Sequence, residues 1–163
     1  MSDWNDVTRT APDFAEAVRR IFDAHKHKTM ATLRRDGSPR ISGIELSFAE
    51  GSIVLGMMPA SMKARDVRRD GRVAVHSASA EPDPDDPAAW PGDAKISGVA
   101  REVEDPAEAV ALLRAMGAPE AVHGSPVFRL EPHEVVLTRV APSGDHLDVL
   151  LWKDGALTAK TAE

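Results

Sequence analysis

The chain has 163 residues, a length that suits one domain and is short for two. Its 20 Lys and Arg residues against 26 Asp and Glu residues leave a net charge of −6, which argues against a dedicated nucleic-acid binder. The chain contains no Cys and no Tyr, which excludes disulfides, thiolate catalysis, Cys-ligated zinc and a phenolic proton donor. No apolar run approaches the roughly 18 residues that span a bilayer, and the acidic first residues are unlike a signal peptide. We therefore expect a cytoplasmic protein that has no membrane segment and does not bind nucleic acid.

The first predicted element is a helix that begins at Pro12 and ends near residues 25–27. Its apolar residues recur at the spacing of one helical face: Phe14, Val18, Ile21 and Phe22.

Three short strands are predicted next, at residues 29–33, 40–48 and 52–57. In the second of them Ile44, Leu46 and Phe48 alternate with polar residues, as in a strand buried on one face. The connections between the three strands are too short for crossover helices, so the strands are expected to form an antiparallel meander.

A short helix at residues 62–70, with Ser61 as its N-cap, is predicted to lead into a strand at 72–77. Residues 81–93 contain four prolines and five acidic residues, and are predicted to form an exposed loop that Trp90 pins down.

The remaining elements are a strand at 94–104, a helix that opens with Asp105 and Pro106, and further strands at 127–131, 134–140 and 146–152. In this helix Glu108 is predicted at the N3 position, and Val110, Leu113 and Met116 are predicted to face the core. A last hairpin is predicted at Asp154-Gly155. Seven to nine mostly antiparallel strands with two or three helices indicate a mainly β protein, a closed or half-closed β-barrel with peripheral helices, in one domain over residues 1–163.

Several catalytic motifs are missing from the sequence. There is no zinc-ligand pattern among the six histidines, no Gly-x-Ser-x-Gly elbow and no Gly-x-Gly-x-x-Gly loop that opens a helix. We therefore expect no metal site, and if the protein is an enzyme a cofactor must supply the chemistry.

The most informative segment, residues 59–72, holds five basic residues in an otherwise acidic chain: Lys63, Arg65, Arg68, Arg69 and Arg72. If Ser61 caps the helix, its hydroxyl, Lys63 and the free N–H groups of the first turn form a phosphate site. The alternative is a solvated basic helix, in which Arg68 and Arg69 pair with Asp66 and Asp70.

Five pieces of sequence resemble the pyridoxamine 5′-phosphate oxidase-like, flavin-binding split-barrel superfamily. They occur in family order and spacing: Ala31-Thr-Leu-Arg-Arg-Asp-Gly-Ser-Pro-Arg40, Ile41-Ser-Gly-Ile-Glu45, Ser61-Met-Lys-Ala-Arg-Asp-Val67, Arg69-Asp-Gly-Arg-Val-Ala-Val75 and Ile96-Ser-Gly-Val-Ala-Arg-Glu-Val103. The resemblance implies an antiparallel split barrel that forms a homodimer and binds FMN in a groove between the subunits.

The resemblance also implies the residues that bind the cofactor. Lys63 matches the family's phosphate-binding lysine, and Ser61 and Arg65 flank it. The strand beside the flavin ring corresponds to Ser42, Gly43 and Ile44, and Met57 and Met58 end the next strand, where many relatives carry Thr or Asn. Three of these positions have alternatives: Gly43 as a bulge or tight bend of the barrel, and Met57 and Met58 as core filler or dimer contacts.

Three functions are consistent with these features. The first is an FMN-dependent oxidoreductase that acts on a small molecule. The second is a reductase that uses the deazaflavin coenzyme F-420 on the same fold. The third is a non-catalytic ligand-binding or structural dimer that has lost its cofactor, which the departure at Met57 and Met58 favours. His76 is a candidate proton donor or a hydrogen-bonded structural residue, and Trp152 is a candidate for the partner's pocket or for the core.

Overall fold

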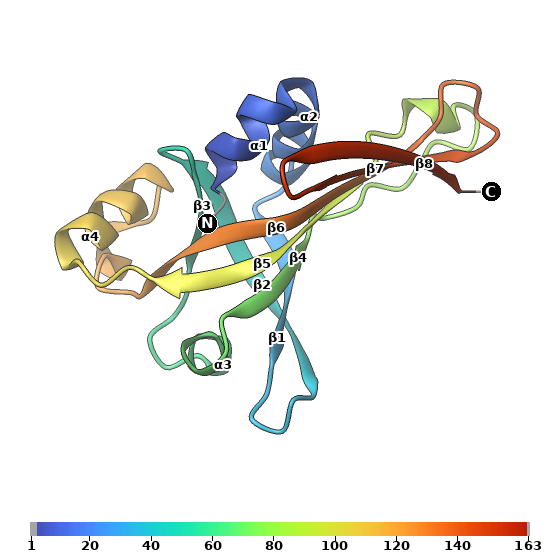
Figure 1. The fold of residues 1–163 in the computed structure, drawn as a ribbon. Helices are drawn as coiled ribbons and strands as arrows, with labels where there is room; N and C mark the ends of the chain where they lie inside the picture. The colour runs from blue at the N-terminus through green and yellow to red at the C-terminus, as the bar shows by residue number, and fades with distance from the viewer. Residues whose placement is uncertain (1–2, 163) are drawn as a thin grey trace.

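The computed structural model describes residues 3–162, and its centre is a closed barrel of six antiparallel strands (Figure 1). The strands follow the order β3-β2-β1-β4-β5-β6, and pairing of β3 with β6 closes the barrel. Two further strands, β7 and β8, extend the sheet outward from β6. The strand bounds are β1 His27–Leu33, β2 Pro39–Ala49, β3 Ser52–Gly56, β4 Arg72–His76, β5 Asp93–Glu102, β6 Val127–Val140, β7 Leu147–Lys153 and β8 Ala156–Ala162. The predicted antiparallel, mainly β architecture is confirmed.

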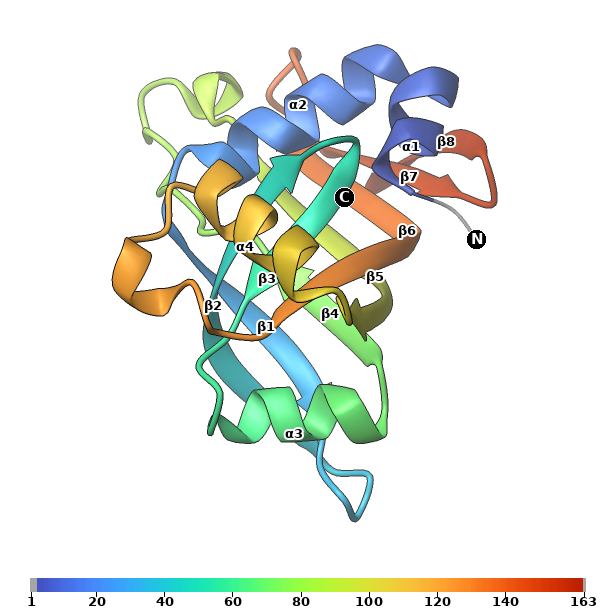
Figure 2. The same ribbon diagram turned by 90° about the vertical axis from the view of Figure 1, so that its left-hand side faces the viewer.

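Helices lie around the barrel rather than within it. The α-helices are α1 Trp4–Thr10, α2 Pro12–Asp23, α3 Met62–Arg69 and α4 Pro106–Ala115, and the 3₁₀ turns are η1 Pro87–Ala89 and η2 Glu120–Val122. Helices α1 and α2 lie at one end of the barrel and α3 lies at the opposite end (Figure 2). No helix within residues 3–162 is both long enough and apolar enough to cross a membrane.

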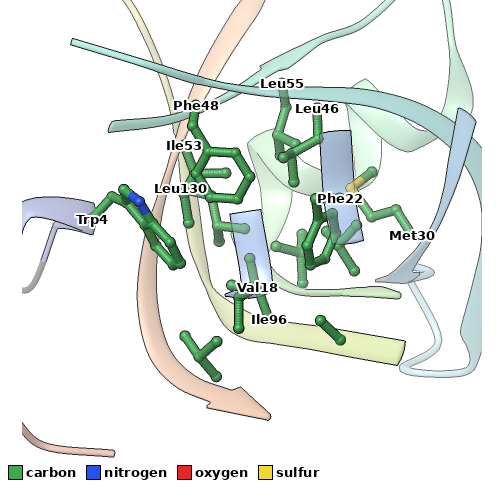
Figure 3. Close-up of a cluster of buried hydrophobic side chains, with 14 of the residues drawn as sticks. Trp4, Val18, Phe22, Met30, Leu46, Phe48, Ile53, Leu55, Ile96 and Leu130 are labelled. Atoms are coloured by element: carbon green, nitrogen blue, oxygen red, sulfur yellow. The ribbon is translucent and has the colours of Figure 1, made fainter. Parts of the chain in front are cut away.

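The core fills the barrel beneath α1 and α2 (Figure 3). The predicted alternation in β2 is confirmed, because Ile44, Leu46 and Phe48 are all buried. Phe48 also contacts both helices: its ring centroid lies 4.6 Å from that of Trp4 and 6.0 Å from that of Phe22. The predicted apolar face of α2 is buried as well: Phe14, Val18, Ile21 and Phe22. Each such side chain stabilises the fold by about 1.5–3 kcal/mol.

Two predicted strands are one in the structure. Strands were predicted at 127–131 and 134–140, but β6 runs from Val127 to Val140 through Pro132. The proline is accommodated at a β-bulge, where the register with β5 shifts between Ser97 and Gly98. Gly98 is essential to this arrangement, since a Cβ atom there would lie 2.0 Å from the carbonyl oxygen of Glu131.

Two features differ from the sequence predictions. Helix α1 was not predicted, although Asp3 and Asp6 form a capping box at its start. On the predicted core face of α4, Leu113 is buried whereas Val110 and Met116 are only half-buried. Asp105 is the N-cap and Glu108 lies at N3, as predicted, and the Glu108 carboxylate accepts a hydrogen bond from Arg129 at 2.6 Å.

The hairpin prediction is confirmed, and the loop predicted over residues 81–93 is confirmed in part. Residues 81–89 are exposed, but 87–89 form the 3₁₀ turn η1 and Asp93 already belongs to β5. The Trp90 indole N–H donates to the Ala80 carbonyl at 2.6 Å, which anchors the loop. Asp154 and Gly155 both have positive φ, of 50° and 79°, as a tight β7–β8 turn requires.

Candidate functional site

A cavity of about 580 Å³ lies on the outside of the barrel, where β2, the end of β3 and α4 meet. One wall is apolar and comes from α4 and the chain after it: Leu113, Met116, Gly117, Ala118, Pro119, Val122 and Ser125. The barrel side consists of Gly43, Ile44, Glu45, Gly56, Met57 and Met58, and the remaining lining residues are Lys26, His27 and Lys63. Five residues predicted from the sequence to hold a cofactor therefore line one cavity: Gly43, Ile44, Met57, Met58 and Lys63.

Helix α3 positions Lys63 at this cavity. Ser61 is the N-cap, and its Oγ accepts a hydrogen bond from the Ala64 amide at 3.3 Å. Lys63 lies in the first turn, and its ammonium donates to the Gly43 carbonyl on β2. The lysine therefore bridges the start of α3 and the strand that forms the cavity floor.

The charged end of the cavity contains two lysines and one carboxylate. Partial burial lowers the pKa of Lys63, and the charge of Glu45 opposes that shift. Glu45 itself forms an ion pair with Lys26, with 3.3 Å between Nζ and Oε1. Because Lys26 already balances Glu45, the positive charge of Lys63 is available to an anionic ligand.

The other predicted site residues lie outside the cavity lining. Ser42 is a neighbour of the lining residue Gly43 on β2, and Ser61 is occupied with capping α3. Arg65 is exposed, and its guanidinium lies 4.0 Å from the sulfur of Met62.

The alternatives for Gly43, Met57 and Met58 are settled differently. Pairing of β1 with β2 runs without interruption through Gly43, so the bulge interpretation is wrong. A Cβ atom at Gly43 would meet nothing within 4 Å, which leaves open space above this strand. Met57 is 3% exposed and Met58 is 76% exposed, so one packs into the core and the other lies at the cavity mouth.

The structure brings residues to the cavity that sequence reasoning missed. Lys26 and His27 come from the start of β1, and His27 pairs in register with Glu45 on β2. The imidazole of His27 adds a hydrogen-bond donor and acceptor to the lining of the cavity. The alternation of buried and exposed residues in β1 and β2 could have indicated that His27 and Glu45 lie side by side. No local pattern in the sequence indicates that Leu113, Met116 and Val122 line the cavity.

Two other candidates lie away from the cavity. His76 does not line it; its Nδ1 lies 2.6 Å from the Ser77 carbonyl, and its Nε2 lies 3.8 Å from the Asp93 carboxylate. Trp152 is 1% exposed and donates its indole N–H to the Thr10 hydroxyl at 2.8 Å, which confirms the core alternative.

Comparison with known proteins defines the family. The family model described as pyridoxamine 5′-phosphate oxidase matches residues 14–139. The chain therefore belongs to the pyridoxamine 5′-phosphate oxidase family. A search of curated protein sequences gave no match.

Solved structures share the fold at low sequence identity. A pyridoxamine 5′-phosphate oxidase-related, FMN-binding protein from Nostoc punctiforme PCC 73102 superposes with a TM-score of 0.63 and 12% identity, over 94% of this chain and 96% of that one. A heme-binding protein from Mycobacterium smegmatis has a TM-score of 0.59 and 22% identity, over 90% of this chain and 57% of that one. An F-420 reductase has a TM-score of 0.51 and 18% identity, over 74% of this chain and 93% of that one. At these identities the likeness concerns the fold alone.

Proposed function

We propose that this protein is an FMN-dependent oxidoreductase whose cavity beside β2 holds the flavin, with Lys63 on the phosphate. The observation that carries the proposal is the Lys63 ammonium, whose hydrogen bond goes to a neutral backbone carbonyl rather than to a carboxylate. An anionic group can replace that carbonyl and form a stronger, charge-assisted hydrogen bond. FMN-binding by a solved protein of the same fold supports the choice of ligand.

The cavity has the size and chemistry that a flavin needs. Its volume of about 580 Å³ falls within the range of cofactor sites, roughly 300–1,000 Å³. The α4 side offers an apolar wall to the ring, while Lys63 and Lys26 lie at the charged end. Bound FMN would supply hydride transfer, and the chain's own residues would orient the ring, shield it from water and, through His27, exchange a proton with the substrate.

The outer face of the barrel supports a homodimer. Small uncharged residues occupy neighbouring positions on β1, β2 and β4, where Ala31 pairs with both Ile41 and Ala74. Ile41 is 74% exposed on the β2 side of this face, next to these small residues. A second copy of the chain would cover Ile41 and close the neighbouring cavity from solvent. Light scattering should then report twice the chain mass of 17.5 kDa.

Cofactor identity and a single substitution test the proposal. Any cofactor released from the purified protein is identified by mass. FMN supports the proposal, whereas coenzyme F-420 would favour the deazaflavin alternative.

Lys63→Ala should weaken FMN binding tenfold or more, because a charge-assisted hydrogen bond contributes about 1.5–3 kcal/mol. Riboflavin, which has the same ring and no phosphate, should bind both proteins equally.

Arg68→Ala is the matched control for this substitution. Arg68 lies on the same helix, outside the cavity, and pairs with Glu102 at 2.5 Å. Its removal should leave FMN affinity unchanged. Equal FMN affinity in the Lys63→Ala variant and the wild type would reject Lys63 as the phosphate ligand. Absence of flavin binding in the wild type would reject the function itself.

A further inference from the structure

A second cavity of about 580 Å³ lies at the helical end of the barrel, between α2, the loop at residues 78–92 and the end of β6. It shares no lining residue with the first cavity. The loop runs beside α2 in both views of the molecule (Figures 1 and 2).

The charged side chains that line this second cavity are both basic: Arg20 from α2 and Arg139 from β6. His25, which follows the end of α2, also lines the cavity. No carboxylate lines it, although the chain as a whole carries a net charge of −6. The acidic residues of the adjoining segment 81–86 are exposed and lie outside the lining.

Both arginines are available to a ligand. Within residues 3–162, the Arg20 side chain forms no hydrogen bond or ion pair with another residue. Arg139 has a partner, Asp148, but the distance between Nε and Oδ2 is 3.5 Å and the arginine side chain is 47% exposed. An incoming anion can therefore bind Arg20 directly and share Arg139 with Asp148.

The rest of the lining is apolar and fixed in place. Ile21, Leu137 and Trp90 provide the larger apolar surfaces. The Trp90 indole is held by its hydrogen bond to the Ala80 carbonyl. The loop also lies directly against β6, since a Cβ atom at Gly92 would be 2.2 Å from the Thr138 carbonyl oxygen. An anchored indole beside one unpaired and one weakly paired arginine suits a ligand that combines a flat ring with a negative charge.

We propose that this second cavity binds a small aromatic organic anion, with its ring against Trp90 and its anionic group held by Arg20 and Arg139. The inference does not depend on what occupies the first cavity. The two cavities are nevertheless lined by consecutive residues. Ala24 and His25 line the second cavity, and the next two residues, Lys26 and His27, line the first.

A pair of fluorescent probes tests the charge requirement. 8-Anilinonaphthalene-1-sulfonate carries an aromatic ring system and one negative charge, and N-phenyl-1-naphthylamine has the same rings without the charge. The wild type should bind the anionic probe at one molecule per chain and at least tenfold more tightly than the neutral one. Arg20→Ala combined with Arg139→Ala should abolish that preference while leaving the neutral probe unaffected.

Two further variants locate the probe. Trp90→Phe should reduce energy transfer from tryptophan to the bound probe. Arg19→Ala is the matched control, because Arg19 is the neighbour of Arg20 on α2, pairs with Asp23 at 3.3 Å and does not line the cavity. The proposal is overturned if the two probes bind equally, if the double arginine variant keeps the preference, or if Arg19→Ala removes it.

Discussion

The two halves of helix α3 use the same kind of side chain for different purposes. In the C-terminal half and just beyond it, Arg68, Arg69 and Arg72 each pair with a carboxylate: Glu102, Asp66 and Asp70 respectively. In the N-terminal half, neither Lys63 nor Arg65 forms an ion pair within residues 3–162. The fold thus neutralises one end of a basic run and leaves the other end positively charged beside a cavity.

Asp66 is the centre of the neutralised half. Its side chain is 2% exposed and accepts hydrogen bonds from Arg40 at 2.6 Å, Arg69 at 3.1 Å and Thr32 at 3.1 Å. Burial raises the pKa of Asp66, but these hydrogen bonds more than offset that effect, so the pKa lies below its ordinary value. The carboxylate thereby ties α3 to β1 and β2.

The largest effect is expected from Asp66→Asn. The substitution leaves Arg40 and Arg69 without their counter-charge, which should lower the free energy of unfolding by about 3 kcal/mol in urea titrations at pH 7. The wild-type carboxylate has a depressed pKa, so its stabilisation is present above the unfolded pKa of about 3.9 and is lost as the pH falls through the folded value. In the Asp66→Asn variant, the free energy of unfolding should therefore decrease less than in the wild type as the pH is lowered through this range.

Asp70→Asn is the control for this prediction. Asp70 is a partner in an ion pair near the same helix, and its hydrogen bonds with Arg72 lower its pKa to about 2. Because this pair lies at the surface, its removal should change the stability far less than Asp66→Asn does. Equal losses in the two variants would contradict a special role for Asp66.

A smaller effect is expected at the other end of the helix. Ser61→Ala removes the hydroxyl that accepts the Ala64 amide, and should lower the free energy of unfolding by about 1 kcal/mol. Ser61→Asp keeps an acceptor at the N-cap and should restore most of the stability. If Ser61→Asp is no more stable than Ser61→Ala, the contribution of Ser61 does not come from capping.

The smallest change in stability is expected from Lys63→Met. The ammonium donates to the carbonyl of Gly43, an exposed residue at which water can replace the lysine. The free energy of unfolding should therefore stay within about 0.5 kcal/mol of the wild type, while FMN affinity falls in the same preparation. A loss of stability comparable to that of Asp66→Asn would mean that Lys63 is a structural residue like those at the far end of α3.

Local patterns in the sequence were sufficient to predict most strands of the barrel. Ile44, Leu46 and Phe48 alternate because one face of β2 is buried, and that periodicity is visible without any tertiary information. The predicted interruption between residues 131 and 134, where Pro132 lies, is wrong for a non-local reason. A proline is tolerated there because Gly98, more than thirty residues earlier, allows β5 to approach the bulge.

The cavity was predictable only in part. Residues 42–44, 57–58 and 61–65 lie in or beside recognisable motifs, and several of them do come together. The opposite wall, with Leu113, Met116 and Val122, reaches the cavity because pairing of β3 with β6 brings α4 against the barrel. Because this contact depends on how the barrel closes, the sequence of α4 shows no periodicity or motif that would predict it.

The segment at residues 24–27 belongs to both cavities: its first two residues line the second cavity, and its last two line the first. Displacement of this segment by a ligand in either cavity alters the lining of both. If such a displacement changes affinity, thermodynamic linkage requires the effect to be reciprocal: an organic anion that tightens flavin binding by some factor must itself be bound more tightly, by the same factor, when flavin is present. Any such coupling would pass through residues 24–27, the one stretch within residues 3–162 that lines both cavities in succession.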